Sequence, residues 1–481
     1  MLIKKIQYLI RHILSLIFLA GWVMAGAQQA DSISGYLKEA ASNNPGLKAR
    51  YSAYLAALEK VPQAGALPDP EMQFSFFLKP MELMQGSQVA DLRLMQMAPW
   101  FGTLKAARDE ASKMALAKYQ EAQSYRNELF LQVKSSWYEV YRTRQEIGVT
   151  EENLALLKSL ERMALIRFRA AEAPAGGGSG AGGDGSGTGM VSGQKQSGSA
   201  MAGSSMSVNS SVSSGNGGSM AGSADASMGG GNQGGMVNVL RVQIEIGTLE
   251  NRLESLKDLL ITAESRFNGA LNRKPESAVF VPDSLTEVSL PGALTSLADS
   301  IANNPMIRMY EADREANEAR IIMATKMGYP MVGIGFNYSL IRKTPDLTSM
   351  MNGKDMIMPM VTATLPIYRK KYGALRREAG FLRDAAAESA INAGNELTVK
   401  YREAIQLYND AGRRSELFER QASLAEKTIV LLTRSFSTSG TDFEEILRMR
   451  LQLLDYQFRQ IEALVDRNTA VARLESIIAY Q

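Results

Sequence analysis

The chain has 481 residues, which is long enough for more than one domain or for one very elongated domain. It has no cysteine and one histidine, His12, in a segment expected to be cleaved, which excludes a Ser-His-Asp triad, a cysteine nucleophile and the usual zinc sites. Its formal net charge of +3 falls to about zero without that basic segment, so no nucleic-acid partner is indicated. We expect neither an enzyme nor a bound cofactor.

The N-terminus has the pattern of a secretory signal peptide. Three basic residues precede or flank an apolar stretch, 13–24, that is too short to span a bilayer comfortably. Ala25-Gly26-Ala27 is a small-x-small cleavage site, so we expect a signal peptide over 1–27 and a mature chain that begins at Gln28. The alternative is an uncleaved membrane anchor.

The rest of the chain repeats itself. Asn43-Asn44-Pro45 recurs as Asn303-Asn304-Pro305, and Pro70 recurs as Pro330, both shifted by 260 positions. Further along, Val239-Leu240-Arg241 recurs as Ile446-Leu447-Arg448. Because the landmarks keep their order, the sequence predicts two copies of one unit, over 28–275 and 276–481.

Each copy is predicted to contain the same elements in the same order. A helix opens at the Asn-Asn-Pro turn, with proline in the first turn, where its missing N–H costs nothing. Two strands follow, then a long helix without proline, then a shorter helix. The predicted ranges are 45–62, 71–79, 88–98, 103–170 and 238–272 in the first copy, and 305–327, 331–341, 356–366, 374–436 and 442–478 in the second.

The strands alternate between apolar and polar or small residues. In the third strand, the alternation sets Val332, Ile334, Phe336 and Tyr338 against Gly333, Gly335, Asn337 and Ser339. This pattern is typical of a membrane barrel around water, although an ordinary soluble hairpin is the alternative. Four strands cannot close a barrel, and open strand edges are not tolerated in lipid, so membrane strands would require oligomerisation.

The long predicted helices, like the strands, indicate an unusual architecture. A helix over 103–170 at about 1.5 Å per residue would span roughly 100 Å, far beyond a typical globular helix. Apolar residues recur at spacings of three and four, as in Phe130, Val133 and Trp137. Both a solvated coiled coil and the wall of a helical tube would have this pattern.

The chain resembles the TolC outer-membrane efflux family in three features taken together. These are the paired Asn-Pro helix starts, the proline-bounded strand pairs, and the turn 434–440 before Glu445-Ile446-Leu447-Arg448. The resemblance covers nearly the whole mature chain except 172–236. It implies a mainly α fold with membrane β: a TolC-like trimeric α/β barrel, with four strands per chain in a 12-stranded barrel and a long periplasmic helical tube.

The resemblance also implies a function and partners. It implies a homotrimer in the outer-membrane lipid, extending into the periplasm, that docks with a periplasmic adaptor (a membrane fusion protein) and an inner-membrane pump. Such a channel conducts substrate passively from the adaptor and pump to the exterior.

In that family the periplasmic helix tips form an entrance that is closed at rest, lined by acidic residues and opened like an iris. The resemblance places the first acidic position at Glu445, but Arg448 occupies the second. The candidate gate residues are therefore Glu445 and Arg448, with their first-copy equivalents Asn238 and Arg241. A pair between Glu445 or Glu444 and Arg448 is a candidate link between helices in the closed state. Solvated charges are the alternative, since Thr441-x-x-Glu444 fits a capping box.

The segment 172–236 is rich in glycine and serine and has no counterpart in the second copy, so we expect it to be disordered. It carries the candidate metal ligands Met190, Met201, Met206, Met220, Met228 and Met236. Other methionines lie in predicted loops and nearby strands: Met81, Met84, Met350, Met351, Met356, Met358 and Met360. Thioethers suit soft Cu(I) or Ag(I), which indicates heavy-metal export, while a flexible linker is the alternative.

Other functions remain open from the sequence. Export of drugs or other organic compounds, or type I secretion, would use the same kind of channel. A periplasmic coiled-coil adaptor would have one helical hairpin flanked by small β-domains, and a fibrous adhesin would lack the alternating strand pairs. The duplication with a strand pair in each copy favours the channel over both.

Overall fold

The computed structural model describes residues 33–172, 233–288, 290, 301–345, 352–439 and 443–478, so the predicted signal peptide lies outside the described residues. The chain divides into two compact units. The first comprises the chain up to Asn153 and from Leu249 onward, and the second is Leu154–Thr248. Each unit is described by itself below.

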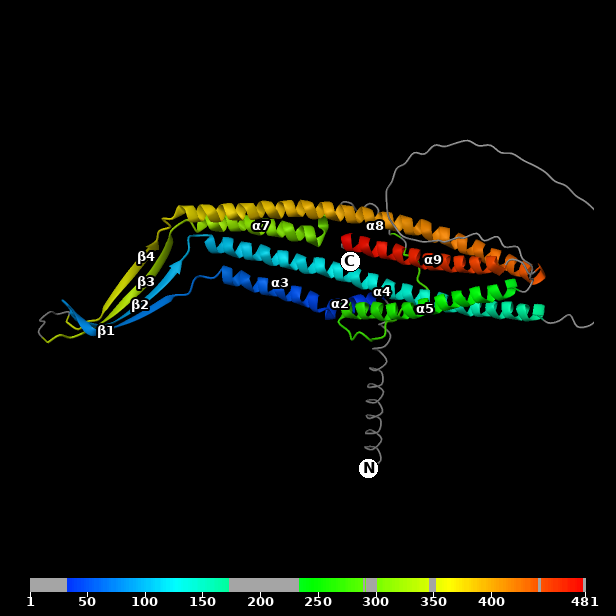
Figure 1. The fold of residues 1–481 in the computed structure, drawn as a ribbon. Coiled ribbons are helices and arrows are strands. Elements are labelled where there is room, and N and C mark those ends of the chain that lie inside the picture. The colour runs from blue at the N-terminus through cyan, green and yellow to red at the C-terminus, as the bar shows by residue number, and fades with distance from the viewer. Residues whose placement is uncertain are drawn as a thin grey trace, which may run out of the picture. The chain divides into compact units, whose positions relative to one another are not determined.

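The predicted elements are present in the predicted order (Figure 1). Their bounds are α2 Ile33–Asn43, α3 Pro45–Ala64, β1 Glu71–Leu83, β2 Gly86–Ala98, α4 Thr103–Glu172, α5 Gln233–Leu271, α7 Pro305–Lys326, β3 Met331–Arg342, β4 Met356–Thr364, α8 Arg369–Ser439 and α9 Phe443–Ile478. The sequence analysis did not predict α2. It was also wrong at the end of the segment 172–236, because α5 already begins at Gln233 and includes Met236.

The four strands form one antiparallel sheet in the order β1-β2-β3-β4 (Figure 1). The central pairing, β2 with β3, joins the strand pairs of the two copies, with Leu94 opposite Phe336. In the outer pairings Phe336 faces Pro359 of β4, and Leu94 faces Met72 of β1. The strands β1 and β4 are therefore the two edges of the sheet, each with one side that no described strand pairs with.

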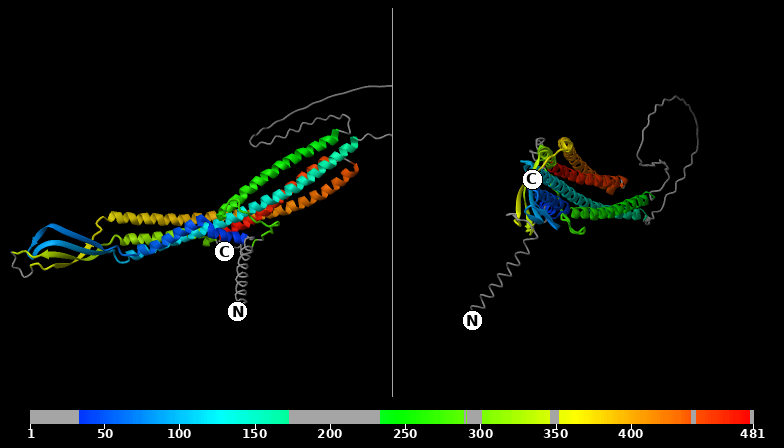
Figure 2. Two further views of the ribbon diagram at one scale, coloured as in Figure 1. Left: turned by 90° about the horizontal axis from the view of Figure 1, so that it is seen from below. Right: turned by 90° about the vertical axis from the view of Figure 1, so that its left-hand side faces the viewer.

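Helices of the first unit extend from the sheet and pack side by side (Figure 2). In the second copy, α7 and α9 both pack against α8. In the first copy, Arg50 of α3 forms an ion pair with Glu121 of α4. The copies are joined as well, because Lys134 of α4 forms an ion pair with Glu475 of α9.

Two equivalent asparagines hold the starts of α3 and α7. The side chain of Asn44 caps α3 by accepting a hydrogen bond from Leu47 N at 3.0 Å, and its Nδ2 donates to Ala270 O, at the end of α5, at 2.9 Å. Asn304 caps α7 in the same way, and its Nδ2 donates to Ile477 O, at the end of α9, at 2.7 Å. Each asparagine thus hydrogen-bonds a backbone N–H at the start of one helix and a backbone carbonyl at the end of another, both of which lack a partner within their own helix.

The segment 275–288 has no helix or strand and is held by side chains of the helices. Hydroxyl groups of Tyr36 and Tyr141 accept from the backbone N–H groups of Phe280 and Leu285 at 3.0 and 3.2 Å. Asn468 accepts from Val288 N at 3.0 Å. These bonds replace the partners that a regular element would supply to buried backbone groups. Nearby, Tyr36, Trp137 and Phe267 belong to one buried apolar cluster.

We expect Asn304→Ala to lower the free energy of unfolding by about 1–2 kcal/mol, because it removes a helix cap and leaves a carbonyl of α9 without its partner. Asn44→Ala should have a similar effect in the first copy. Denaturant titration of the purified protein measures the change. Asn303→Ala, at the exposed neighbouring position, is the control, and equal losses in Asn303→Ala and Asn304→Ala would contradict this role.

Candidate functional site

The sheet has one apolar face, as the alternation predicted. Residues opposite one another in the register share a face, and successive residues of a strand alternate between faces. The apolar face comprises Met72, Phe74, Phe76, Leu92, Leu94, Val332, Ile334, Phe336, Tyr338, Ile357 and Val361. On the two edge strands this face is open in the single chain: Phe74 of β1 is 67% exposed and Val361 of β4 is 77% exposed. An apolar surface of this kind requires a membrane or a protein partner.

The opposite face is polar and small, with methionines among the polar residues. Asp91 accepts a hydrogen bond from Ser339 Oγ at 2.8 Å and another from Gln88 Nε2 at 3.3 Å. The methionines of this face are Met95, Met97, Met331, Met356, Met358 and Met360. The sequence analysis named only those of β4. Continuing the alternation of Leu92 and Leu94 by two residues would have placed Met95 and Met97 here.

One glycine of β3, Gly335, lies between methionines of both neighbouring strands, and a second, Gly333, lies between Met97 and Thr362. Met95, Gly335 and Met360 form one row of the register, and Met97 faces Gly333 in the next row. A Cβ added to Gly333 would lie 2.4 Å from Sδ of Met97 and 3.5 Å from Sδ of Met95. The two thioethers therefore occupy the space that a side chain at this position would fill.

Aromatic residues gather where the strands meet the helices, a feature that the sequence analysis missed. Trp100 follows β2 and stacks on Tyr329, which precedes β3, with ring centroids 5.4 Å apart. Phe101 and Tyr368, which follows β4, are largely exposed. Rings at the level where a membrane barrel meets water are typical of such proteins. Aromatics at three of the four junctions were the available signal in the sequence.

Within the described helices, no segment is both long and apolar enough to span a membrane.

The tip between α8 and α9 belongs to the first unit. Phe443 is buried at the start of α9, and its ring lies 5.5 Å from that of Phe436 in α8. Glu445 and Arg448 form the predicted ion pair, and the hydrogen bond from Arg448 to this carboxylate raises the pKa of the guanidinium. The pair lies within one helix, so the expectation that it links two helices is wrong for this chain alone. Thr441, the expected cap, lies outside the described residues.

The tip formed by α4 and α5 belongs to the second unit. Here Asn238 is partly buried, Arg241 is exposed, and Gln243 Nε2 donates to Glu161 Oε1 at 2.8 Å. Met236, 42% exposed, also lies on α5. The other candidate ligands, Met190, Met201, Met206, Met220 and Met228, lie outside the described residues. The structure thus brings Glu445 and Arg448 together and places Asn238 and Arg241 in the other unit.

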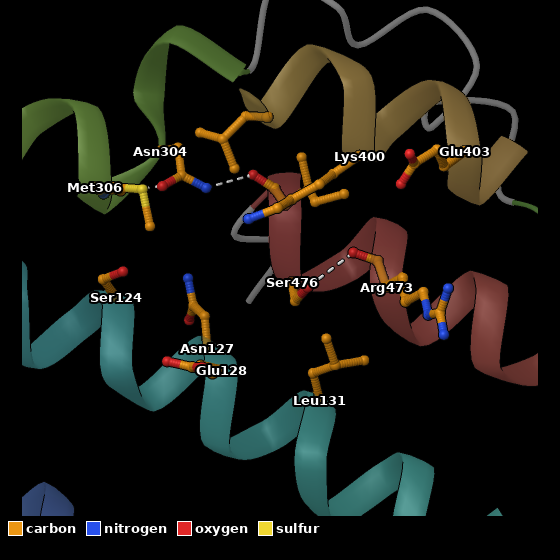
Figure 3. A pocket seen from close by; sticks show the side chains of 12 residues that line it. Ser124, Asn127, Glu128, Leu131, Asn304, Met306, Lys400, Glu403, Arg473 and Ser476 are labelled. Atoms are coloured by element: carbon orange, nitrogen blue, oxygen red, sulfur yellow. Dashed lines mark hydrogen bonds between the residues drawn. The ribbon is translucent and has the colours of Figure 1, made fainter. Parts of the chain in front are cut away.

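A cavity of about 350 Å³ lies between α4, α8, α9 and the start of α7 (Figure 3). Its lining includes Glu128, Lys400, Glu403 and Arg473, together with the capping side chain of Asn304. Figure 3 shows these charged groups spread over three helices rather than converging on one point. Among the described residues, no group of three or more His, Cys, Asp or Glu side chains could hold a metal ion. Thioethers are therefore the soft ligands to consider.

Neither a protein-family model nor a curated protein matches this sequence. Solved structures do match its fold. The outer membrane protein VceC from Vibrio cholerae has a TM-score of 0.67 at 12% identity, covering 93% of this chain and 95% of that chain. CusC, in crystal structures that describe folding and transmembrane channel formation, has a TM-score of 0.66 at 13% identity, covering 93% and 91%.

The open state of the MtrE outer membrane channel of Neisseria gonorrhoeae has a TM-score of 0.66 at 11% identity, covering 93% of this chain and 89% of that chain. The chain therefore has the fold that the family resemblance implied, a mainly helical channel fold with a four-stranded sheet in each chain.

Proposed function

We propose that this chain is an exported outer-membrane exit channel of the TolC type, built from two repeats over 28–275 and 276–481 and assembled as a homotrimer. The observation that carries the proposal is the sheet, which has one exposed apolar face, one polar face and two open edges. Lipid tolerates no unpaired backbone edge, so β1 and β4 must pair with strands of other copies. Three copies supply twelve strands, and the similarity to solved outer-membrane channels supports this number.

The helices of the first unit support the same assembly. Leu417, Leu424 and Leu431 repeat every seven residues on α8 and are all exposed in the single chain. A heptad spacing is typical of a seam that packs against another helix. On α3, Tyr51, Leu55 and Leu58 form a second exposed row at helical spacing. Helices of neighbouring copies would cover both rows in a closed helical wall.

In this proposal the chain conducts substrate passively and performs no chemistry. It would receive substrate at its periplasmic helix tips from an adaptor and an inner-membrane pump. The polar face of the sheet would line the water-filled interior, and its apolar face would contact the outer-membrane lipid. The aromatic residues at the strand–helix junctions, such as Trp100 and Tyr329, would lie at the periplasmic membrane surface.

We expect the detergent-purified protein to be a trimer that conducts ions in planar bilayers. Val361→Arg should abolish assembly, because a cation on the lipid face near the bilayer midplane costs about 2–4 kcal/mol per chain. Thr362→Arg, the adjacent residue on the polar face, is the matched control and should still assemble and conduct. A water-soluble monomer without conductance, or equal loss in both variants, would refute the channel.

We further propose that Glu445 and Arg448, with Asn238 and Arg241, lie at the periplasmic entrance. Because Arg448 is paired with Glu445, the carboxylate is partly neutralised where three copies would converge. Arg448→Ala should therefore shift the reversal potential in a KCl gradient toward that of K⁺, and Glu445→Gln should shift it toward that of Cl⁻.

The control for the entrance is Glu416→Gln, which removes a similar exposed ion pair, with Arg420, from the middle of α8. This substitution should leave the reversal potential unchanged. If Glu445→Gln and Glu416→Gln behave alike, Glu445 is a solvated surface charge and not part of the entrance.

For the cargo we propose a soft monovalent metal ion, Cu(I) or Ag(I), in preference to an organic compound. The support is the methionine content of the segment 172–236 in a chain whose mature part has no cysteine or histidine. Replacing the six methionines of this segment by serine in the full chain should lower the silver bound per chain in equilibrium dialysis. A control in which six serines of the segment become alanine should bind as the parent does, and equal binding by both variants would contradict the proposal.

A further inference from the structure

We propose that Met95, Met97 and Met360 form a thioether binding site for a soft monovalent cation, Cu(I) or Ag(I), on the polar face of the sheet. This inference rests on the proposed channel, because only in the assembled barrel does that face line the path of the cargo. The site is distinct from the segment 172–236 and lies wholly within described strands.

The sulfur atoms of Met95 and Met97 lie close together on the polar face of the sheet. Sδ of Met97 and Sδ of Met95 both lie over Gly333, at 2.4 and 3.5 Å from the point that a Cβ there would occupy. Two thioethers on one strand thus converge above the backbone of the next strand. Methionine has three rotatable bonds and a polarizable sulfur, so small rotations can direct both sulfur atoms to a shared ion.

Gly335 on the central strand β3 leaves space between the methionines of β2 and β4. Met95 and Met360 stand in one row on either side of Gly335, about 10 Å apart at the backbone for two strand spacings. Because Gly335 has no side chain, nothing on β3 separates the two methionines in this row. A larger residue there would meet Leu94 O at 2.4 Å, so the gap is built into the backbone. The third sulfur can therefore approach the pair from the opposite side.

The ligand chemistry of the methionine side chains favours a soft cation. Thioether sulfur is a poor ligand for hard cations such as Mg²⁺ or Ca²⁺ and a good one for Cu(I). The described residues offer no competing cluster of His, Cys, Asp or Glu ligands. A sheet face that only had to contact water would favour hydroxyl and amide side chains, such as those of Ser339 and Asn337 on β3. Methionines on this face require another explanation, and a soft cation supplies one.

A neighbouring cation limits how tightly the site can bind. Nη2 of Arg93 donates a hydrogen bond to Sδ of Met360 at 3.4 Å. An arriving metal ion must displace this contact and is repelled by the guanidinium. The site should therefore bind weakly and release quickly, as a conducting pathway requires. Arg93→Gln should consequently tighten silver binding.

The test measures block of the channel current by Ag⁺ in nitrate salts, in a full-length parent whose segment 172–236 carries serine in place of methionine. Changing Met95, Met97 and Met360 together to leucine keeps the side-chain volume nearly constant. We expect the half-blocking Ag⁺ concentration to rise about tenfold or more in this variant. The matched control changes Met114 and Met163, which lie in α4, and Met327, which follows α7, to leucine; all three are also partly exposed, and this variant should behave as the parent.

Equal block in the triple variant and the parent would overturn the site while leaving the channel intact. Absence of any current before Ag⁺ is added would instead overturn the channel, and a second measurement then decides the site alone. In the unmodified protein, bound Ag⁺ should protect Met95, Met97 and Met360, but not Met114, from oxidation to the sulfoxide by peroxide, as read by mass spectrometry. Unchanged oxidation rates at these three methionines would overturn the site.

Discussion

The structure depends on one constraint: every backbone N–H and C=O group that leaves water needs a partner. At the helix starts, Asn44 and Asn304 supply it, each joining two helices through one amide side chain. Along the segment 275–288, tyrosine hydroxyls and Asn468 supply it. At the two sheet edges, no described strand pairs with the outer side of β1 or β4, and this is the reason for proposing an assembly of several copies.

In both copies, equivalent asparagines supply these backbone partners. The two copies differ in their strands and helix tips, where function is expected. The capping asparagines and their carbonyl partners are equivalent in the two copies. The strands are not equivalent, because β2 carries Met95 and Met97 whereas the strand that corresponds to it, β4, carries Met356, Met358 and Met360. The tips differ too, because α9 carries the pair Glu445 and Arg448, whereas α5 keeps the arginine, as Arg241, but has Asn238 in place of the glutamate. Structure is thus conserved between the copies, and chemistry is divided between them.

The sequence predicted the elements well because their signals are local. The alternation through Val332, Ile334 and Phe336 and the proline after Asn304 lie within single elements. The strand register places Gly335 opposite Met95 on one side and opposite Met360 on the other. It joins three strands from distant parts of the chain, so no local sequence pattern could predict it. The Glu445–Arg448 pair was predictable from its spacing of three, and its confinement to one helix already followed from the predicted helix over 442–478, which matches α9. The short helix α2 was missed because it offers barely three turns of weak periodicity.

The joints at Asn44 and Asn304 also have a consequence for the order of folding. A chain made from its N-terminus presents Asn44 and Ala270 while the second copy is still to come, so the first joint can close early. Asn304 must wait for Ile477, in the last turn of α9, although the two loops cost similar closure entropy. Until α9 arrives, the start of α7 holds an unsatisfied amide, and α8 lacks the helix that packs along it. The second copy therefore completes its helical packing only when the last helix of the chain has been made.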